Sequence, residues 1–291
     1  MEMWFLAALV GALLAGVSNF FFKVAANNGY DAEVFTLISG LVSVLAAGAF
    51  AVFVGATLLQ LDILVFVMLA AGVLAASGGI MKVYALRHID STIYFPLFKL
   101  LAPGLAIVFG IVWFAESFVM QEWIGMALGL TVPLLLITKS ENGRQNNLKA
   151  GLVFVLLTAL ASALAAALNK FVIDAGISVV TGLFYASLGV FLGTIMTIVF
   201  KKGLWSTYRH ITDGYSAPVF WYGSIRAILI CASLGFILYA YQEGSLAIIQ
   251  TIHSMYILIP IILSVILYSE HWNTQKALAV TFSIAALVLL G

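Results

Sequence analysis

The chain has 291 residues, of which 64% are apolar and 9% are charged, and its formal net charge is +1 at pH 7. A soluble domain cannot bury this much apolar surface, so lipid is expected to surround most of the chain, and the near-zero net charge gives no support for a nucleic-acid partner. The single cysteine, Cys231, lies in an apolar run, which excludes an intrachain disulfide and a cysteine-built metal site and predicts a buried, inert thiol.

Long apolar runs predict an all-α integral membrane protein with ten transmembrane helices. A spanning helix needs about 20 mostly apolar residues, and its backbone groups must be hydrogen-bonded within the segment because hydrocarbon offers no partners. The first run has no basic segment before it, so it is interpreted as a spanning helix rather than a cleaved signal. The expected helices cover residues 4–26, 32–57, 62–86, 91–115, 120–138, 149–173, 177–200, 218–240, 244–268 and 273–290.

The two halves of the chain show the same pattern, which predicts two inverted five-helix repeats at residues 1–140 and 141–291. In the first two matching pairs the residues are separated by the same number of positions along the chain, and in the later pairs by a slightly larger number. We assign this difference to the longer loop at 201–217. Because each half has an odd number of helices, the second must enter the membrane from the opposite side, as in many secondary transporters. The matching positions are Lys23 with Lys170, Gly29 with Gly176, Ser91 with Ser245, Lys99 with His253, Glu116 with Glu270, and Gln121 with Gln275.

Basic residues in the loops predict an orientation, because cytoplasmic loops carry an excess of lysine and arginine. They fall in the odd-numbered connections, and the even-numbered connections and both termini carry none. This distribution places the odd-numbered connections in the cytoplasm and both termini outside. The residues are Arg87, Lys139, Arg144, Lys149, Lys201, Lys202, Arg209 and Lys276.

Short motifs near the end of each half resemble those of the EamA-type members of the drug/metabolite transporter superfamily. The first half has Pro103, then Ala-Glu-Ser at 115–117 and Gln-Glu-Trp-Ile-Gly at 121–125; the second has Ser-Glu-His at 269–271 and Gln275. The resemblance covers nearly the whole chain and implies ten helices and carrier-type transport of small organic solutes, including amino acids, amines and sugars, in a cell (inner or plasma) membrane. Many members keep both termini in the cytoplasm, opposite to the charge pattern here.

This chain also departs from that family pattern in two places. Ile257 stands where the second half would have its proline, and Ser39 and Gly40 lie where the family has an arginine early in the second helix. Any role of that arginine is therefore not carried over to this chain.

Two basic residues lie well inside predicted helices, where a charge costs at least about 2.5–3.5 kcal/mol. Lys99 is flanked on one helix face by Pro96 and Pro103, so that face offers a cation and a carbonyl left free by proline. The alternative is a lysine that snorkels to the interface or pairs with a carboxylate. Arg226 must face a partner, water or an anionic substrate group, unless its helix is shorter and it lies at an interface.

His253 lies near the middle of the run 244–268, with Gln250 and Pro260 on its face and Tyr256 nearby. Histidine changes charge near neutral pH, which suits a proton-coupled carrier, whereas a neutral, hydrogen-bonded histidine is the structural alternative. The remaining ionisable residues are expected at helix ends, as snorkelling lysines or as helix caps and interface anchors. They are Lys23, Lys82 and Lys170, and Glu116 and Glu270.

Tyrosine and tryptophan near helix ends usually form the interfacial belt, which is the expected place of Tyr94, Trp221 and Tyr241. Four deeper aromatic residues are candidates for lining a pocket, and an aromatic cage would attract a quaternary amine. These are Tyr84, Phe98, Tyr239 and Tyr256.

The leading hypothesis is therefore a secondary carrier of a small organic solute, with its site among residues 62–86, 91–115, 218–240 and 244–268. Interior cations outnumber deep carboxylates, which favours a carboxylate-bearing solute such as an amino acid; the alternative is a carrier of a cationic or quaternary amine. The sequence contains no HExxH motif and no close pair of acidic residues, so an enzyme is not predicted. No cofactor or metal is expected. The expected partners are the solute, the lipid bilayer and a coupling proton or ion, and two fused repeats favour a monomer. The predicted substrate-binding residues are Lys99, Arg226, His253, Gln250, Tyr84, Phe98, Tyr239 and Tyr256.

Overall fold

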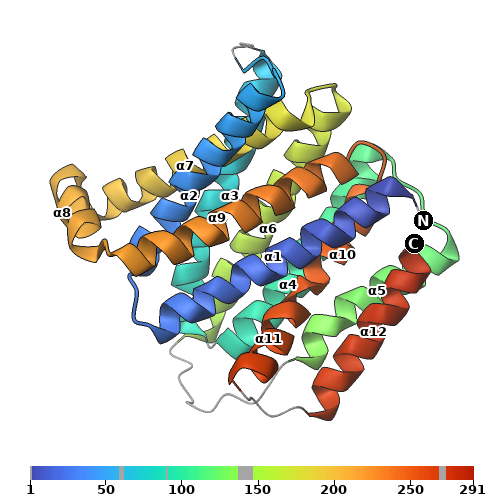
Figure 1. Ribbon diagram of the computed structural model, residues 1–291. Helices are drawn as coiled ribbons and strands as arrows, with labels where there is room; N and C mark the ends of the chain where they lie inside the picture. Colours follow the sequence, from blue (N-terminus) through green and yellow to red (C-terminus); the bar gives the residue numbers. More distant parts are fainter. Residues whose placement is uncertain (1, 59–61, 90, 137–146, 269–272) are drawn as a thin grey trace.

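The computed structural model describes residues 2–58, 62–89, 91–136, 147–268 and 273–291, and the regular elements in these ranges are all helices (Figure 1). Eight helical segments are long and apolar enough to cross a membrane, so the chain is an all-helical, multi-pass membrane protein. These segments are α1 (Met3–Asn27), α2 (Ala32–Phe53), α3 (Ile63–His88), α4 (Ser91–Phe114), α6 (Leu148–Asp174), α7 (Val179–Lys202), α9 (Ala217–Ala240), and α10 (Leu246–Ser254) with α11 (Leu258–Tyr268).

Helices lie in every range that the sequence predicts, but two of them are shorter than the roughly 20 residues that a crossing helix needs. α5 (Met120–Leu135) has 16 residues and α12 (Thr274–Leu290) has 17. The two pack side by side (Figure 1), and the Gln121 side chain donates a hydrogen bond to the Leu289 carbonyl at 3.1 Å. This pair joins the end of the first half to the end of the second.

The predicted helix 244–268 is broken in the structure. A single 3-10 turn, η1 (Met255–Ile257), separates α10 from α11. The break lies just before Pro260, whose ring clashes with the carbonyl of Tyr256, four residues earlier, and removes the hydrogen bond to it. The helix geometry therefore changes between His253 and the C-terminal end of this segment.

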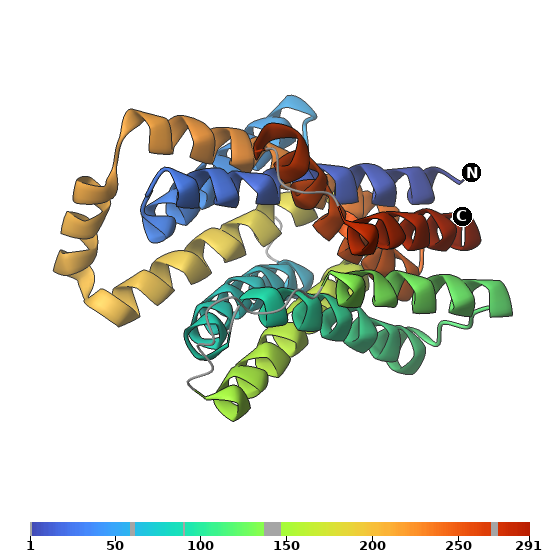
Figure 2. The same ribbon diagram turned by 90° about the horizontal axis from the view of Figure 1, so that it is seen from below.

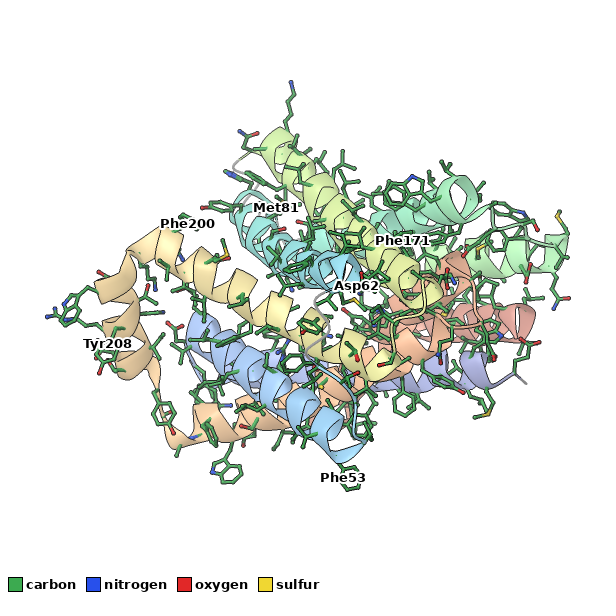
Figure 3. The ribbon with its side chains drawn as sticks, turned by 90° about the horizontal axis from the view of Figure 1, so that it is seen from above. Phe53, Asp62, Met81, Phe171, Phe200 and Tyr208 are labelled. Carbon is green, nitrogen blue, oxygen red and sulfur yellow. The ribbon has the colours of Figure 1, made fainter. Side chains whose placement is uncertain are left out.

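The expected loop at 201–217 contains a further helix, α8 (Leu204–Gly214), which stands apart from the bundle (Figure 1). His210 of α8 and Lys201 and Lys202 at the end of α7 form ion pairs with Glu33 at the start of α2. The exposed side of α8 carries Trp205 and Tyr208, and Figure 3 shows Tyr208 pointing away from the bundle. Aromatic residues of this kind are typical of the membrane–water interface.

Helices of the two halves interleave. α1 packs against α9 on one side of the molecule, and α3 and α4 pack against α6 on the other (Figure 2). α3 also crosses α7 at very close range: a Cβ added to Gly72 would lie 2.8 Å from the Cα of Gly189 and 2.3 Å from the carbonyl oxygen of Ala186. Gly72 therefore serves packing, as its position in a run of small residues predicts.

The two ends of the chain lie together at one end of the bundle (Figure 1), where Gly291 contacts the Phe5 ring. Cys231 is buried and free, as predicted. Several features singled out in the sequence lie outside the described residues. They are the boundary between 140 and 141, the loop residues Lys139 and Arg144, the motif at 269–271 with Glu270, and the side chains of Lys23, Arg87 and Ser91.

Candidate functional site

A cavity of about 330 Å³ lies in the middle of the bundle, between helices of both halves. α2, α3, α4, α6, α7, α9, α10 and η1 all contribute to its wall. Six of the eight predicted site residues line it, namely Phe98, Lys99, Arg226, Gln250, His253 and Tyr256. A volume of this size suits a small organic molecule.

Lys99 supplies the most deeply buried charge of the wall, with 7% of its surface exposed. Its Nζ lies 3.5 Å from the centre of the Tyr256 ring and 5.4 Å from that of Phe98. Among the described residues, ion pairs are formed by Lys170, Lys201, Lys202 and His210, and Lys99 is not one of them. In the part of the chain that the structure describes, its Nζ is therefore compensated by aromatic faces, which stabilise a positive charge much less than a carboxylate does.

Arg226 brings a second cation to the same cavity from α9. The centre of its guanidinium group lies 4.1 Å from the centre of the Phe22 ring. Its Nε is buried and has no hydrogen-bond partner among the described residues. A buried donor without a partner costs about 1–3 kcal/mol, so this atom is energetically unfavourable in the structure described.

The polar residues of α10 form the next part of the wall. The edge of the His253 ring meets Tyr256 with centroids 5.1 Å apart, and the Gln250 amide donates a hydrogen bond to the Tyr241 hydroxyl. Tyr241 is 1% exposed, which corrects the expectation that it belongs to the interfacial belt. Burial raises the pKa of the Tyr241 hydroxyl, so this side chain is neutral in its hydrogen bond with Gln250.

Asn169 of α6 is a wall residue that the sequence analysis missed. Its Oδ1 is buried and has no hydrogen-bond partner among the described residues. An asparagine in the apolar run Ala-Leu-Asn-Lys at 167–170 is unusual at membrane depth, and this was the signal available in the sequence. Asn169 gives the cavity an amide beside its cations.

Small hydroxyl residues complete the wall and tie its helices together. Ser43 of α2 donates to the Ala227 carbonyl in α9 at 3.2 Å, and the Ser39 hydroxyl of α2 lies 2.8 Å from the Phe35 carbonyl of its own helix and 3.1 Å from the Gly223 carbonyl of α9. Ser233 of α9 donates to a carbonyl of α1 at 2.7 Å. Because each hydroxyl uses its one hydrogen on a backbone carbonyl, its oxygen can only accept further bonds.

Tyr84 and Tyr239, the other two predicted site residues, lie away from the cavity. Tyr84 is 41% exposed and stacks on Phe154 at 5.5 Å, and Tyr239 is 43% exposed on the outer surface beside Met3 and Phe236. Their depth along the helix was inferred from the sequence, but the face on which they lie was not, because both helices are apolar on all sides.

Two other expectations about helix ends are corrected. Tyr94 is fully buried rather than interfacial, whereas Trp221 is 65% exposed, as an interfacial residue should be. Lys170 does not snorkel: it is 8% exposed, and its Nζ donates to Asp174 Oδ1 at 2.9 Å and to the Tyr241 carbonyl at 3.0 Å. Its charge is therefore paired inside the protein.

Glu116 acts as a helix cap, one of the two roles expected for it, but the helix belongs to the other half. Its carboxylate accepts hydrogen bonds from the backbone N–H groups of Leu246 and Ala247 at 2.5 and 3.2 Å, at the start of α10. Burial raises the pKa of this carboxyl group, and the two backbone hydrogen bonds partly offset the effect. Gly110 provides the space, since a Cβ there would lie 2.2 Å from Glu116 Oε2.

One cluster of potential metal ligands is found outside the cavity. Oxygen and nitrogen atoms of Asp31, Glu33 and His210 lie within 4.8 Å of one another. Lys201 and Lys202 already pair with Glu33, however, and two ammonium groups would repel a metal ion. The cluster is better explained as the ion-pair network that holds α8 to α2.

The comparisons with known proteins concern the fold. No family model matches the sequence, and no curated protein matches it. A protein of known crystal structure is similar in fold, with a TM-score of 0.77 and 13% sequence identity, over 97% of this chain and 95% of the other. At this identity the similarity extends to the arrangement of the helices along nearly the whole chain, and not to function.

Proposed function

We propose that this protein is a secondary carrier of a small organic solute that bears a carboxylate. The observation that carries the proposal is the central cavity, into which Lys99 and Arg226 bring positive charge. No acidic residue is found among the described residues of its wall.

The charge balance supports a function in binding. Placing a cation in a low-dielectric interior without a partner is costly, and proteins retain such groups mainly at functional sites. Lys99 and Arg226 have no internal acid among the described residues, and the Arg226 Nε and the Asn169 Oδ1 lack hydrogen-bond partners there. A solute carboxylate would supply the missing negative charge and acceptors.

The repeat predicted from the sequence is supported by how the helices pair. If α1 to α5 correspond to α6, α7, α9, α10–α11 and α12, the α3–α6 contact becomes α9–α1, and the α3–α7 contact becomes α9–α2; all four are observed. The α5–α12, α4–α10 and α2–α7 contacts each map onto themselves. Contacts that exchange in this way are expected of two pseudo-symmetric halves.

The turns at corresponding places in the two halves also match. Gly29 and Gly176 both have positive φ, 69° and 96°. Backbone hydrogen bonds join Tyr30 to Ala25 in the first turn and Ile177 to Val172 in the second. The proposal therefore includes ten membrane crossings arranged as two inverted repeats. It also includes membership of the EamA-type drug/metabolite transporters.

The proposed mechanism is alternating access, in which one half rocks against the other about a central site. Lys99 from the first half, and Arg226 and His253 from the second, would face one solute. Such movement would expose the cavity to each side of an inner or plasma membrane in turn. A proton or ion gradient would supply the energy, and one chain would be sufficient because it contains both halves.

A carrier of a quaternary amine is the second candidate, and the aromatic residues of the wall favour it less than the sequence suggested. Cation–π recognition needs a ring face that is free of other cations. Lys99 lies over Tyr256, and Arg226 lies over Phe22. A cationic solute would therefore meet two positive charges beside the rings that should attract it.

The proposal is tested by transport into proteoliposomes that contain the purified protein. We expect uptake of a labelled amino acid or other carboxylate, stimulated by the unlabelled solute on the opposite side, as a carrier shows and a pore does not. Lys99→Gln and Arg226→Gln should abolish it, whereas Lys201→Gln, which removes an exposed lysine outside the cavity, should not. Uptake of amines that survives both cavity substitutions would overturn the proposal.

A further inference from the structure

A third basic residue lies beside the cavity. Lys82 of α3 was expected to snorkel to the interface, but its ammonium lies 4.7 Å from the centre of the Phe95 ring and 5.8 Å from that of Phe22. It makes no ion pair with a residue that the structure describes. Its side chain is only partly exposed. Lys82 is thus a second lysine held by aromatic rings without an internal acid.

Lys82 and Arg226 share one of these rings. The Lys82 ammonium is 5.8 Å and the Arg226 guanidinium 4.1 Å from the centre of Phe22, so the two groups are at most 9.9 Å apart. Arg226 is on the cavity wall, and Lys82 is next to it rather than on it. A flexible four-carbon stem allows a lysine ammonium to move towards a bound anion.

We propose that the solute carries two negative charges, and that Lys82 acts with Lys99 and Arg226 to select it. This inference rests on the proposed carrier function and makes its substrate class more specific. The shared chemistry is a dianion, either a short dicarboxylate or a phosphate monoester.

Charge balance is the reason for preferring a dianion. The Arg226 guanidinium and the protonated forms of Lys99 and Lys82 together bring three positive charges to the cavity and its edge, with no acidic residue among the described residues of the wall. A zwitterionic amino acid is neutral and leaves the excess charge unchanged, and a monocarboxylate removes one unit. A dianion removes two, which lowers the electrostatic cost of holding these cations away from water.

The test compares solutes of similar size and different charge. Binding of succinate, glycerol 3-phosphate, butyrate and 4-aminobutyrate to the purified full chain is measured by isothermal titration calorimetry at pH 7.5. The first two carry about two negative charges, since the second pKa of a phosphate ester is near 6, the third carries one, and the fourth is a zwitterion. We expect at least one dianion to bind about tenfold more tightly than butyrate, equivalent to ~1.4 kcal/mol, and 4-aminobutyrate to bind most weakly.

Variants of Lys82 test its part in this preference. Lys82→Gln should lower dianion affinity by about fivefold and leave butyrate affinity within about twofold, because a dianion loses one of three nearby cations whereas a monoanion is held by Lys99 and Arg226 alone. Lys82→Arg, which keeps the charge, should retain the preference. Lys201→Gln is the matched control for loss of one positive charge outside the cavity, and it should change neither affinity.

The outcomes separate the two proposals. Binding of butyrate or 4-aminobutyrate as tightly as both dianions overturns the dianion assignment and leaves a carrier of carboxylates in place. A dianion preference that is as large in Lys82→Gln as in the unaltered protein shows that Lys82 takes no part in selection. If none of the four solutes binds, and the proteoliposomes take up no carboxylate, both proposals fail.

Discussion

Lys99 and Lys170 are almost equally buried, at 7% and 8% exposure, but their surroundings are opposite. The Lys170 ammonium pairs with Asp174 and with the Tyr241 carbonyl, whereas the Lys99 ammonium faces the Tyr256 ring and the cavity. Burial alone therefore does not distinguish a binding residue from a structural one. The distinction lies in whether the protein itself supplies the compensating negative charge.

The two lysines also differ in the polar groups around them. Lys170 lies at the same end as the chain termini, where Glu116 caps α10 and Gln250 bonds to Tyr241. The polar groups there are satisfied by one another and hold α4, α6, α9 and α10 together. In the middle of the bundle, Arg226 Nε and Asn169 Oδ1 have no partner among the described residues. Hydrogen-bonding groups are therefore satisfied around Lys170 and unsatisfied at these atoms of Arg226 and Asn169 among the described residues.

The largest expected effect is on solute binding by Lys99→Gln. Removing one partner of a desolvated charge pair costs 2–5 kcal/mol or more, so the affinity for a carboxylate should fall on the order of 100-fold. The melting temperature without solute should stay equal or rise, because an unpaired buried charge is removed. Titration calorimetry and thermal unfolding of the same preparation measure both quantities. A clear fall in melting temperature with unchanged affinity would mean that Lys99 is structural.

Lys170→Met should show the reverse result. It leaves Asp174 and the Tyr241 carbonyl without their donor, and hydrogen bonds to charged groups contribute about 1.5–3 kcal/mol each. We expect the free energy of unfolding to fall by about 2 kcal/mol, and solute affinity to change far less than in Lys99→Gln. Denaturant titration in detergent tests the first part. An unchanged free energy of unfolding would show that the Lys170–Asp174 ion pair contributes nothing to stability, which is common for exposed ion pairs.

A smaller effect on stability is expected from Gln250→Leu. It removes the donor to the buried Tyr241 hydroxyl, and a neutral hydrogen bond of this kind contributes about 1 kcal/mol. A double-mutant cycle with Tyr241→Phe isolates the interaction, because the pair should cost less together than the two single changes do in sum. Strict additivity in thermal unfolding would show that the hydrogen bond has no energetic role.

The smallest expected effect is the pH dependence caused by Glu116. Burial raises its pKa above the ordinary value of 4.5. The folded state therefore binds this proton more tightly than the unfolded state, and stability falls as pH rises from 4.5 through the raised pKa. Glu116→Gln should remove that part of the slope. Chemical unfolding of both proteins between pH 4 and pH 8 provides the comparison, and identical slopes would contradict it.

The sequence predicted the helices well, because hydrocarbon forces each long apolar run to satisfy its backbone internally. It also indicated Lys99, Arg226 and His253 as site candidates, and all three line the cavity, because ionisable residues are rare within such apolar runs. It did not predict which lysine is paired inside the protein. Asp174, four residues after Lys170, was a visible hint, but the Tyr241 carbonyl comes from a distant helix.

The sequence also did not predict which face of each helix points towards the cavity. Tyr84 and Tyr239 were placed in the cavity by depth, but α3 and α9 are apolar on every side, so the sequence holds little signal for the inward face. Asn169 was not predicted because it lies next to Lys170 near the end of an apolar run, where polar residues are common. α8 was not predicted because the Lys-Lys-Gly before it, at 201–203, and its own polar residues are typical of a loop; contacts with Asp31 and Glu33 hold it in place.

The crossing of Gly72 and Gly189 constrains how the two halves can move. With backbone atoms of α3 and α7 already in contact, the helices cannot approach further, and sliding would drive neighbouring side chains into the opposing backbone. Rotation about the crossing point keeps that contact intact. In the proposed transport cycle the axis of motion therefore passes through this pair of glycines, and the distance between them stays constant while the helix ends swing.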